Sequence, residues 1–264
     1  MLTVSKVTKI FNQGTINEKV ALSHLELKLK SGDFVTIIGG NGAGKSTLLN
    51  VISGVYYVDG GSVEINETDI SQQPEHKRAK YIGRVFQDPM MGTAADMTIE
   101  ENIAMALRRG KKRSLGSGIS SSQRQLIVEQ LKMLDLGLEN RLKTVAGLLS
   151  GGQRQAITLL MATIIKPDLL LLDEHTAALD PKTARKVLAL TEKIVSEHKL
   201  TTMMVTHNMK DAIAYGNRII MLNEGRIILD IPEDEKKNLK VEDLLSMFEK
   251  TSGQKIESDR MLLA

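Results

Sequence analysis

Apolar and polar residues alternate near the start of this chain, and short continuous apolar runs follow. Residues 21–30 alternate in Leu-Glu-Leu-Lys-Leu-Lys, and residues 2–7 and 62–65 have the same strand character, which predicts an antiparallel sheet half exposed to water. Residues 34–38 and 169–172 are unbroken apolar runs bounded by turn residues, which is typical of parallel strands buried on both faces. The pattern therefore predicts two different sheets.

Helical spacing begins where the strand patterns stop. Apolar residues recur at three- and four-residue steps between about residues 99 and 161, most clearly in residues 125–136, which predicts a helical lobe. Residues 46–54 predict a helix that ends at a glycine, and residues 241–250 predict a terminal helix. The strands and helices together predict an α/β fold.

A glycine-rich loop lies between the expected strand at 34–38 and the expected helix at 46–54. It fits G-x-x-x-x-G-K-[ST] without a mismatch, in the strand, loop and helix order that the motif requires. Its glycines let backbone N–H groups converge on an anion, and the helix N-terminus adds a partial positive charge. We expect Lys45 to reach the β- and γ-phosphates of a nucleotide and Ser46 to offer its hydroxyl to Mg²⁺. The alternative is an ordinary glycine turn. The segment comprises Gly39, Gly40, Asn41, Gly42, Ala43, Gly44, Lys45, Ser46 and Thr47.

Two carboxylates end the apolar run at residues 169–172. Asp173 and Glu174 are expected in the crevice at the carboxyl ends of the parallel strands, where open α/β sheets bind ligands. Asp173 is then placed to hold Mg²⁺ and Glu174 to polarise the water that attacks the γ-phosphate. The alternative is a polar strand end before a helix cap. Parallel strands resume at 201–205, and residues 219–230 predict a closing hairpin.

A second anion-binding turn follows about a hundred residues after the first. Ser150, Gly151, Gly152 and Gln153 stand at an expected helix start, where a hydroxyl and backbone amides can aim at one anion. The first loop already surrounds the phosphates, so one nucleotide cannot easily use both turns of one subunit. The natural solution is two copies that face each other.

The order of these features resembles the ATP-binding subunit of an ABC transporter, and the resemblance covers nearly the whole chain. It is carried, in order, by Phe11, the glycine loop, Gln87, Leu149-Ser150-Gly151-Gly152-Gln153, Leu172-Asp173-Glu174, Ala178-Leu179-Asp180 and His207. The resemblance implies a P-loop ATPase core with a parallel sheet and helices, an N-terminal antiparallel β subdomain and an inserted helical lobe. The implied parts are a core at about 1–95 and 162–232, a lobe at about 96–161 and a C-terminal helical extension at 233–264.

The resemblance also implies a role for each matching residue. Phe11 would stack on adenine, where Tyr is commoner in the family; the alternative for Phe11 is core packing in the small N-terminal sheet. Gln87 would touch Mg²⁺ and the attacking water. Asp180 would communicate across a dimer, His207 would contact the γ-phosphate, and Glu174 would be the catalytic carboxylate. Gly39 to Thr47 of one copy and the serine turn at 150–153 of the other would enclose each ATP.

The implied partners are a second copy, a transmembrane permease and an extracytoplasmic solute-binding protein, at the cytoplasmic face of the membrane. The exposed contact to the permease is expected near residues 87–93, where Met90 and Met91 offer adaptable apolar side chains. The sequence, including Gln87-Asp88-Pro89 and the Asp-Glu-His-Thr-Ala segment that begins at Asp173, is similar to ATPases of uptake systems for small organic solutes. Aromatic amino acids are among those solutes. An iron–sulfur assembly ATPase of the same family is the alternative in a different class. A kinase or a P-loop GTPase is disfavoured by the serine turn and by the absence of an N-K-x-D segment.

Two features depart from the family pattern or stand outside it. His175 follows Glu174 where the family usually has Pro, and we expect a tolerated loop substitution, with His175→Pro leaving hydrolysis within about threefold. The alternative is that His175 is a metal ligand or a second base. The basic, Gly/Ser-rich residues 108–122 predict a solvated flexible loop, with contact to acidic lipid headgroups or to the partner subunit as the alternatives.

Composition removes several other classes of function. The net charge of +3 and the 3% aromatic content argue against nucleic-acid binding. The absence of cysteine excludes disulfides and cysteine-ligated metal sites. No apolar run reaches the roughly eighteen residues of a spanning helix, and the first residues predict a strand rather than a signal peptide. We therefore expect a chain that does not itself enter the membrane.

Overall fold

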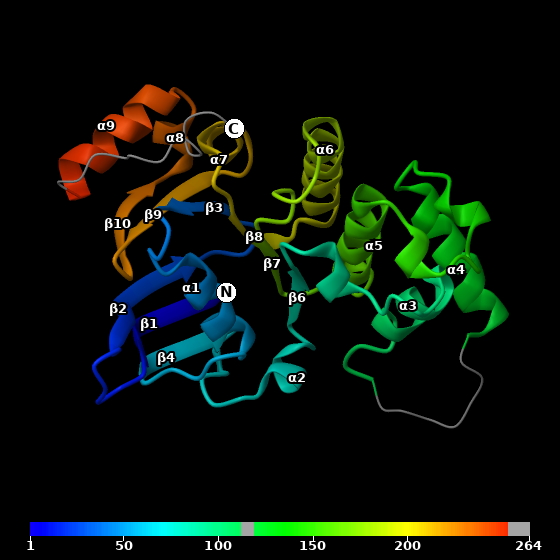
Figure 1. Cartoon of the computed structure of the whole chain (residues 1–264), viewed down its shortest axis with the longest axis horizontal. Coiled ribbons are helices and arrows are strands. Elements are labelled where there is room, and N and C mark those ends of the chain that lie inside the picture. The colour runs from blue at the N-terminus through cyan, green and yellow to red at the C-terminus, as the bar shows by residue number, and fades with distance from the viewer. Residues whose placement is uncertain (112–118, 253–264) are drawn as a thin grey trace.

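A computed structural model describes residues 1–111 and 119–252 of the 264-residue chain. The expected antiparallel sheet is present at the N-terminal side, with strand order β2-β1-β4-β5 (Figure 1). Strand β1 extends beyond the expected residues to Phe11, because its end still pairs with Lys19 of β2. The strands of this sheet are β1 (Leu2–Phe11), β2 (Lys19–Leu29), β4 (Gly60–Ile65) and β5 (Thr68–Asp69).

The second sheet has the order β10-β9-β3-β8-β7-β6. Its five strands from β9 to β6 run parallel, and β10 closes the edge as an antiparallel hairpin with β9. Because β3, β8 and β7 are neighbours, the segments that follow their carboxyl ends meet at one edge of the sheet. The strands are β3 (Phe34–Gly39), β6 (Ile82–Val85), β7 (Leu169–Asp173), β8 (Thr201–Val205), β9 (Arg218–Asn223) and β10 (Arg226–Ile231).

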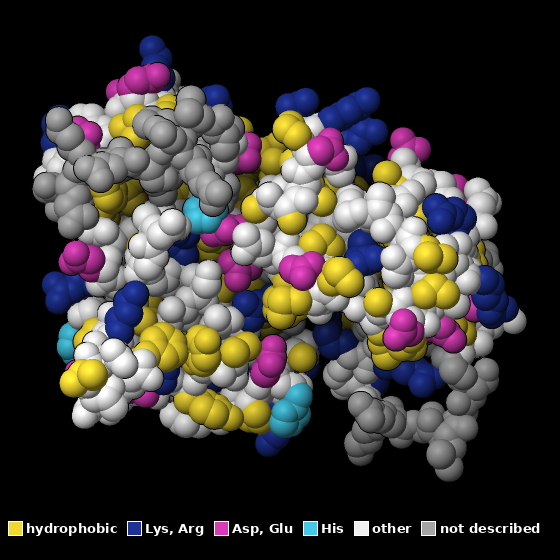
Figure 2. All heavy atoms as spheres, in the orientation of Figure 1, with side chains coloured by type: hydrophobic (Ala, Val, Ile, Leu, Met, Phe, Trp, Pro, Cys, Tyr) yellow, Lys and Arg dark blue, Asp and Glu magenta, His cyan; other side chains and the backbone are white. Residues whose placement is uncertain are grey.

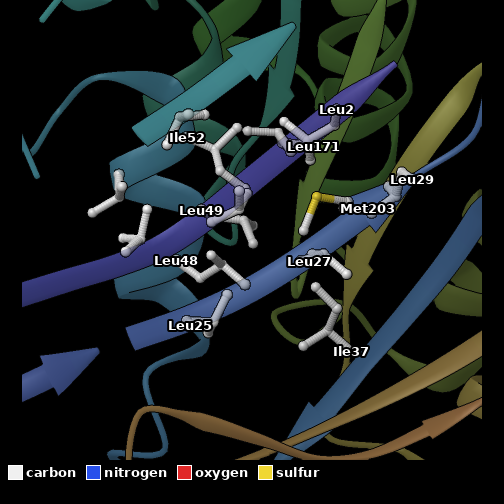
Figure 3. Packing of buried hydrophobic residues seen from close by; sticks show 14 of the residues in the cluster. Leu2, Leu25, Leu27, Leu29, Ile37, Leu48, Leu49, Ile52, Leu171 and Met203 are labelled. Atoms are coloured by element: carbon white, nitrogen blue, oxygen red, sulfur yellow. The ribbon is translucent and has the colours of Figure 1, made fainter. Parts of the chain in front are cut away.

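One hydrophobic core joins the two sheets (Figure 3). The inward side of the alternating strand β2 supplies Leu25, Leu27 and Leu29, which are at most 3% exposed. They pack with α1 and with apolar residues of the central strands such as Leu171 and Met203. This shared core fixes the position of the antiparallel sheet relative to the parallel sheet, and helix α1, which follows the glycine loop, packs in it.

Helices cover the parallel sheet and build the lobe beside it (Figure 1). Helix α5 contacts α3 in the lobe and α6 and β6 in the core, so it joins the two parts. The helices are α1 (Lys45–Ser53), α2 (Glu75–Arg78), α3 (Ile99–Ala106), α4 (Ser121–Lys132), α5 (Gly151–Thr163), α6 (Pro181–His198), α7 (Met209–Ala214), α8 (Glu233–Lys236) and α9 (Val241–Ser252).

The lobe departs from the sequence predictions in two places. Helix α4 occupies residues 121–132 rather than 125–136, because the Ser120 hydroxyl accepts from Gln123 N and the Gln123 side chain accepts from Ser120 N. This capping box starts the helix early. The expectation of a solvated loop over residues 108–122 is wrong for Arg109, which donates to the carbonyls of Ala162 and Ile165 at the end of α5. Residues 112–118 of that basic segment lie outside the described residues.

The helices and the surface of the described chain have two general features. Over residues 1–111 and 119–252, no helix combines the length and the apolar character that a membrane crossing needs. Figure 2 shows Lys, Arg, Asp and Glu side chains interspersed over the face drawn, with apolar side chains between them.

Candidate functional site

Two glycines of the loop occupy positions that no other residue fits. Gly39 ends β3 with φ at 151°, and a Cβ there would lie 2.3 Å from the carbonyl oxygen of Leu222. Gly44 has φ at 103°, and a Cβ there would lie 2.7 Å from the carbonyl oxygen of Ala21. The loop backbone therefore packs directly against β9 and β2, which leave no space for a side chain at these two positions. Helix α1 begins directly after Gly44, at Lys45. Its free N–H groups point toward the space in front of the loop.

The Lys45 side chain folds back over this loop. Its Nζ donates to the carbonyl oxygens of Gly39 at 2.8 Å and Gly40 at 3.0 Å, and the residue is only 6% exposed. Burial lowers the pKa of Lys45, while the carboxylates of Glu174 and Asp173 partly oppose that shift. The ammonium group is thus held against the loop, and it interacts with the charges of Glu174 and Asp173.

The loop opens into a cavity of about 250 Å³. Its walls come from both sheets and from the ends of β7 and β8. The cavity is lined by Phe11, Lys19, Ala21, Asn41, Gly42, Ala43, Gly44, Lys45, Ser46, Thr47, Glu174 and His207. The Phe11 ring packs edge-on against Tyr56, with ring centroids 5.2 Å apart, and so forms an aromatic wall. An aromatic wall opposite a cationic, amide-rich loop matches a nucleotide with its base at one end and its phosphates at the other.

Glu174 reaches this cavity from a strained backbone position. Its φ is 45°, in the left-handed region that non-glycine residues rarely adopt, and its N–H donates to the Val205 carbonyl at 3.1 Å. Its Oε1 lies 2.5 Å from Nε2 of His207, which follows β8 closely. The carboxylate side chain is 9% exposed and the imidazole 35%. Strain of this kind persists only where the surrounding structure determines it, and it is frequent in active sites.

Asp173 lies one residue earlier and has a different partner. Its Oδ2 lies 3.3 Å from Nη2 of Arg84 on the neighbouring strand β6. Arg84 also donates to Asn50 at 2.8 Å and to Ser53 at 3.0 Å, so it connects β7 with helix α1. Burial raises the pKa of Asp173, and the guanidinium group opposes that rise. The ion pair holds this carboxylate at the end of β7, where it also interacts with the charge of Lys45.

The available ligands fit Mg²⁺ bound together with phosphates. The described ranges 1–111 and 119–252 contain no group of three or more His, Asp or Glu residues arranged to hold a metal ion. Mg²⁺ characteristically takes one or two protein oxygens, and phosphates and water supply the rest. The hydroxyl of Ser46 lines the cavity and the carboxylate of Asp173 stands at the adjoining strand end. These two residues match that donor set.

The serine turn lies apart from the cavity in the same chain. Ser150 caps α5: its hydroxyl oxygen accepts from Gln153 N at 3.3 Å, and the Gln153 side chain accepts from Ser150 N at 3.2 Å. That bond uses an oxygen lone pair, so the hydroxyl hydrogen can still donate to an anion. None of residues 150–153 lines the cavity.

Asp180 belongs to this second cluster. It is exposed and caps α6 by accepting from Thr183 N at 3.1 Å. Gly152 allows α5 to approach α6, because a Cβ on Gly152 would lie 2.1 Å from Cγ2 of Thr183. The serine turn and Asp180 therefore form a cluster outside the cavity that the glycine loop lines.

Gln87 lies in neither cluster. It is exposed just beyond β6 and does not line the cavity. Met90 and Met91, in the 3₁₀ turn Pro89–Gly92, are 58% and 67% exposed. The two methionine side chains of this turn are therefore exposed apolar groups.

Sequence reasoning missed three residues around the site. Lys19 lines the cavity, and nothing in the short strand pattern distinguishes it from other surface lysines. Arg84 stood out only as a charge within the apolar segment Ile-Gly-Arg-Val. Thr191, which contacts His175, carried no signal at all, since it is one of many polar residues in helix α6.

Comparison with known proteins agrees with this geometry. The sequence profile of the family described as ABC transporter matches residues 22–177. The tyrosine transport ATP-binding protein of Clostridioides difficile (strain R20291) is 44% identical over 94% of this chain and 99% of that protein. The methionine import ATP-binding protein MetN of Bartonella henselae is 33% identical over 86% of this chain and 64% of that protein.

Solved structures give the same result. The dimeric ATP-binding cassette MJ0796, in a post-hydrolysis state bound to ADP and Pi, superposes with a TM-score of 0.75 and 32% identity, covering 88% of this chain and 99% of that one. The cbiO1 protein from Clostridium perfringens, part of an ABC transporter complex, superposes with a TM-score of 0.75 and 25% identity over 94% of each chain. With a family match over more than half its length and a relative of 44% identity along nearly all of it, the chain belongs to the ABC transporter family as an ATP-binding and ATP-hydrolysing cassette.

Proposed function

We propose that two copies of this chain pack head to tail and hold two ATP molecules between them. The observation that carries the proposal is the separation of the two half-sites: the glycine loop lines a cavity, and Ser150 and Asp180 lie outside it. A second copy turned to face the first would bring its serine turn to the open side of that cavity. The solved cassette that resembles this chain, with ADP and Pi bound, is dimeric, which supports the same arrangement.

Within each site the residues divide the work. Lys45 and the loop amides bind the phosphates, Phe11 packs against the base, and Ser46 with Asp173 would hold Mg²⁺, which supplies charge neutralisation on the phosphates. Glu174 orients and polarises the attacking water, and His207, whose Nε2 lies 2.5 Å from Glu174 Oε1, holds the carboxylate in place near the γ-phosphate. The γ-phosphate favours the closed dimer because it contacts both copies, and its loss opens the dimer.

Opening and closing would drive a membrane permease at the cytoplasmic face. The exposed segment around Gln87, Met90 and Met91 supports this contact, since flexible apolar side chains suit a partner helix. The 44% identical relative is a tyrosine transport protein, so we propose uptake of an aromatic amino acid, with an extracytoplasmic solute-binding protein delivering it. The relatives reported above belong to transport systems, and none supports the iron–sulfur assembly alternative.

Glu174→Gln tests the clamp directly. The amide keeps the shape of the side chain and removes the base, so MgATP should still bind, turnover should fall by at least about a hundredfold, and a dimer should accumulate. Sedimentation velocity with MgATP and with MgADP measures the assembly. A variant that stays monomeric when saturated with MgATP at high protein concentration would refute the proposal.

A second variant separates the two half-sites. Adding Ser150→Arg to Glu174→Gln should abolish the ATP-dependent dimer, because the arginine blocks the turn that faces the partner. ATP affinity of the monomer should stay within about twofold, since Ser150 lies outside the cavity of its own chain. Uptake of labelled tyrosine by cells that express the chain with its neighbouring permease tests the substrate, with other amino acids as competitors.

A further inference from the structure

His175 stands directly after Glu174, and the structure buries it. It lies in the turn that follows β7, and the residue is 2% exposed. Its Nε2 is 3.1 Å from Oγ1 of Thr191, in the middle of helix α6, and Thr191 is itself only 1% exposed. A buried polar pair connects the turn after the catalytic strand to a neighbouring helix.

The direction of this hydrogen bond follows from the hydroxyl group. The Thr191 hydroxyl donates its hydrogen to the Val187 carbonyl at 2.8 Å. A hydroxyl has one hydrogen, so its oxygen must accept from His175. The imidazole therefore carries its hydrogen on Nε2. Burial keeps the ring neutral by lowering the pKa of His175 to about 4.

The turn has few other anchors. The Glu174 N–H is bonded to Val205, and the next backbone bonds, Ala177 N to Glu174 O and Leu179 N to Thr176 O, lie within the turn itself. The Glu174 backbone is in the left-handed region, which stores strain that a loosened turn could release. The His175 side chain is thus a tie from the turn to α6, the helix that Asp180 caps.

We propose that His175 is a positioning residue, whose Nε2–H bond to Thr191 holds the strained Glu174 backbone so that its carboxylate stays aligned with His207. This inference rests on the proposed catalytic role of Glu174. The family pattern usually has proline at this position, which restricts the backbone through its ring. This chain obtains the restriction from a side-chain hydrogen bond. The bond also links the turn after β7, which carries Glu174, with helix α6, whose N-cap Asp180 lies in the cluster of the serine turn.

Paired substitutions test the bond from both ends. His175→Leu and Thr191→Val each remove one partner, and each should lower kcat about three- to tenfold, the worth of one hydrogen bond, with KM for MgATP unchanged. The double variant should be no slower than the slower single variant, because both changes remove the same interaction. His175→Gln and Thr191→Ser retain a donor and a hydroxyl and should stay within about twofold of wild type.

Two further measurements give the result a clear meaning. In the wild-type protein, two-bond ¹H–¹⁵N spectra of labelled histidine should show the hydrogen on Nε2 of His175; a hydrogen on Nδ1 with a bare Nε2 would overturn the inference. A wild-type kcat in Thr191→Val, or additive losses in the double variant, would also overturn it. If Glu174→Gln hydrolyses ATP at the wild-type rate, the proposed function fails. If Glu174→Gln is inactive while His175→Leu and Thr191→Val are unaffected, only the positioning role fails.

Discussion

Acidification from near pH 7.5 to near pH 5 should destabilise the folded protein through the imidazole of His175. Burial lowers the pKa of this ring from 6.5 to about 4. In the unfolded chain the ring takes up a proton as the pH falls below about 6.5, whereas in the folded protein it stays neutral until about pH 4. The unfolded state then binds more protons, so the free energy of unfolding falls as the pH falls through this window. The stability is fully present above the unfolded pKa.

The size of the effect follows from the two pKa values. One proton of difference changes the free energy of unfolding by about 1.4 kcal/mol per pH unit. With a folded pKa of about 4 against 6.5 in the unfolded chain, the loss reaches about 2 kcal/mol at pH 5. That loss is a substantial part of the roughly 5–15 kcal/mol by which folded proteins are stable.

Urea unfolding followed by circular dichroism measures this loss at both pH values. His175→Leu is the reference, because it removes the titrating ring and leaves all carboxylates and other histidines in place. Their contributions cancel in the comparison, so wild type should lose about 2 kcal/mol more than the variant on acidification. Losses equal to within about 0.5 kcal/mol would show that the ring takes up a proton in the folded protein, and the burial argument would be refuted.

Two other substitutions probe the contacts around the half-sites. Gly152→Ala should lower the free energy of unfolding by about 1–3 kcal/mol, because the new methyl group would lie 2.1 Å from Thr183 Cγ2. Adding Thr183→Ser removes that methyl contact and should restore most of the lost stability. Wild-type stability of Gly152→Ala alone would contradict the close packing of α5 on α6. Arg84→Met should cost about 1–3 kcal/mol in urea unfolding, because it removes the ion pair with the half-buried carboxylate of Asp173 and the hydrogen bonds to Asn50 and Ser53. Arg84→Lys should cost less than Arg84→Met, and a loss below about 1 kcal/mol in Arg84→Met would mean that water already solvates the carboxylate.

The local parts of the site could be predicted because their causes are local. An apolar run, a glycine loop and a helix start occupy consecutive residues from Phe34 to Ser53, and each follows from neighbouring side chains and backbone conformation. The closing hairpin and the strand that ends at Asp173 are confirmed for the same reason. The start of α4 was misplaced because the capping box at Ser120 outweighed the apolar spacing that follows it.

The order of residues along the chain thus determined which segments become strands, where phosphates can bind and which carboxylates stand at a strand end. It did not determine which side chains meet. The pair Arg84–Asp173 exists because β6 lies beside β7 in the sheet, and the pair His207–Glu174 exists because β8 lies on the other side of β7. The pair His175–Thr191 exists because α6 packs beside the turn after β7. Tertiary packing also decided that the serine turn lies outside the cavity of its own chain. Contacts between distant segments depend on how buried surfaces fit together, and no short stretch of sequence contains that information.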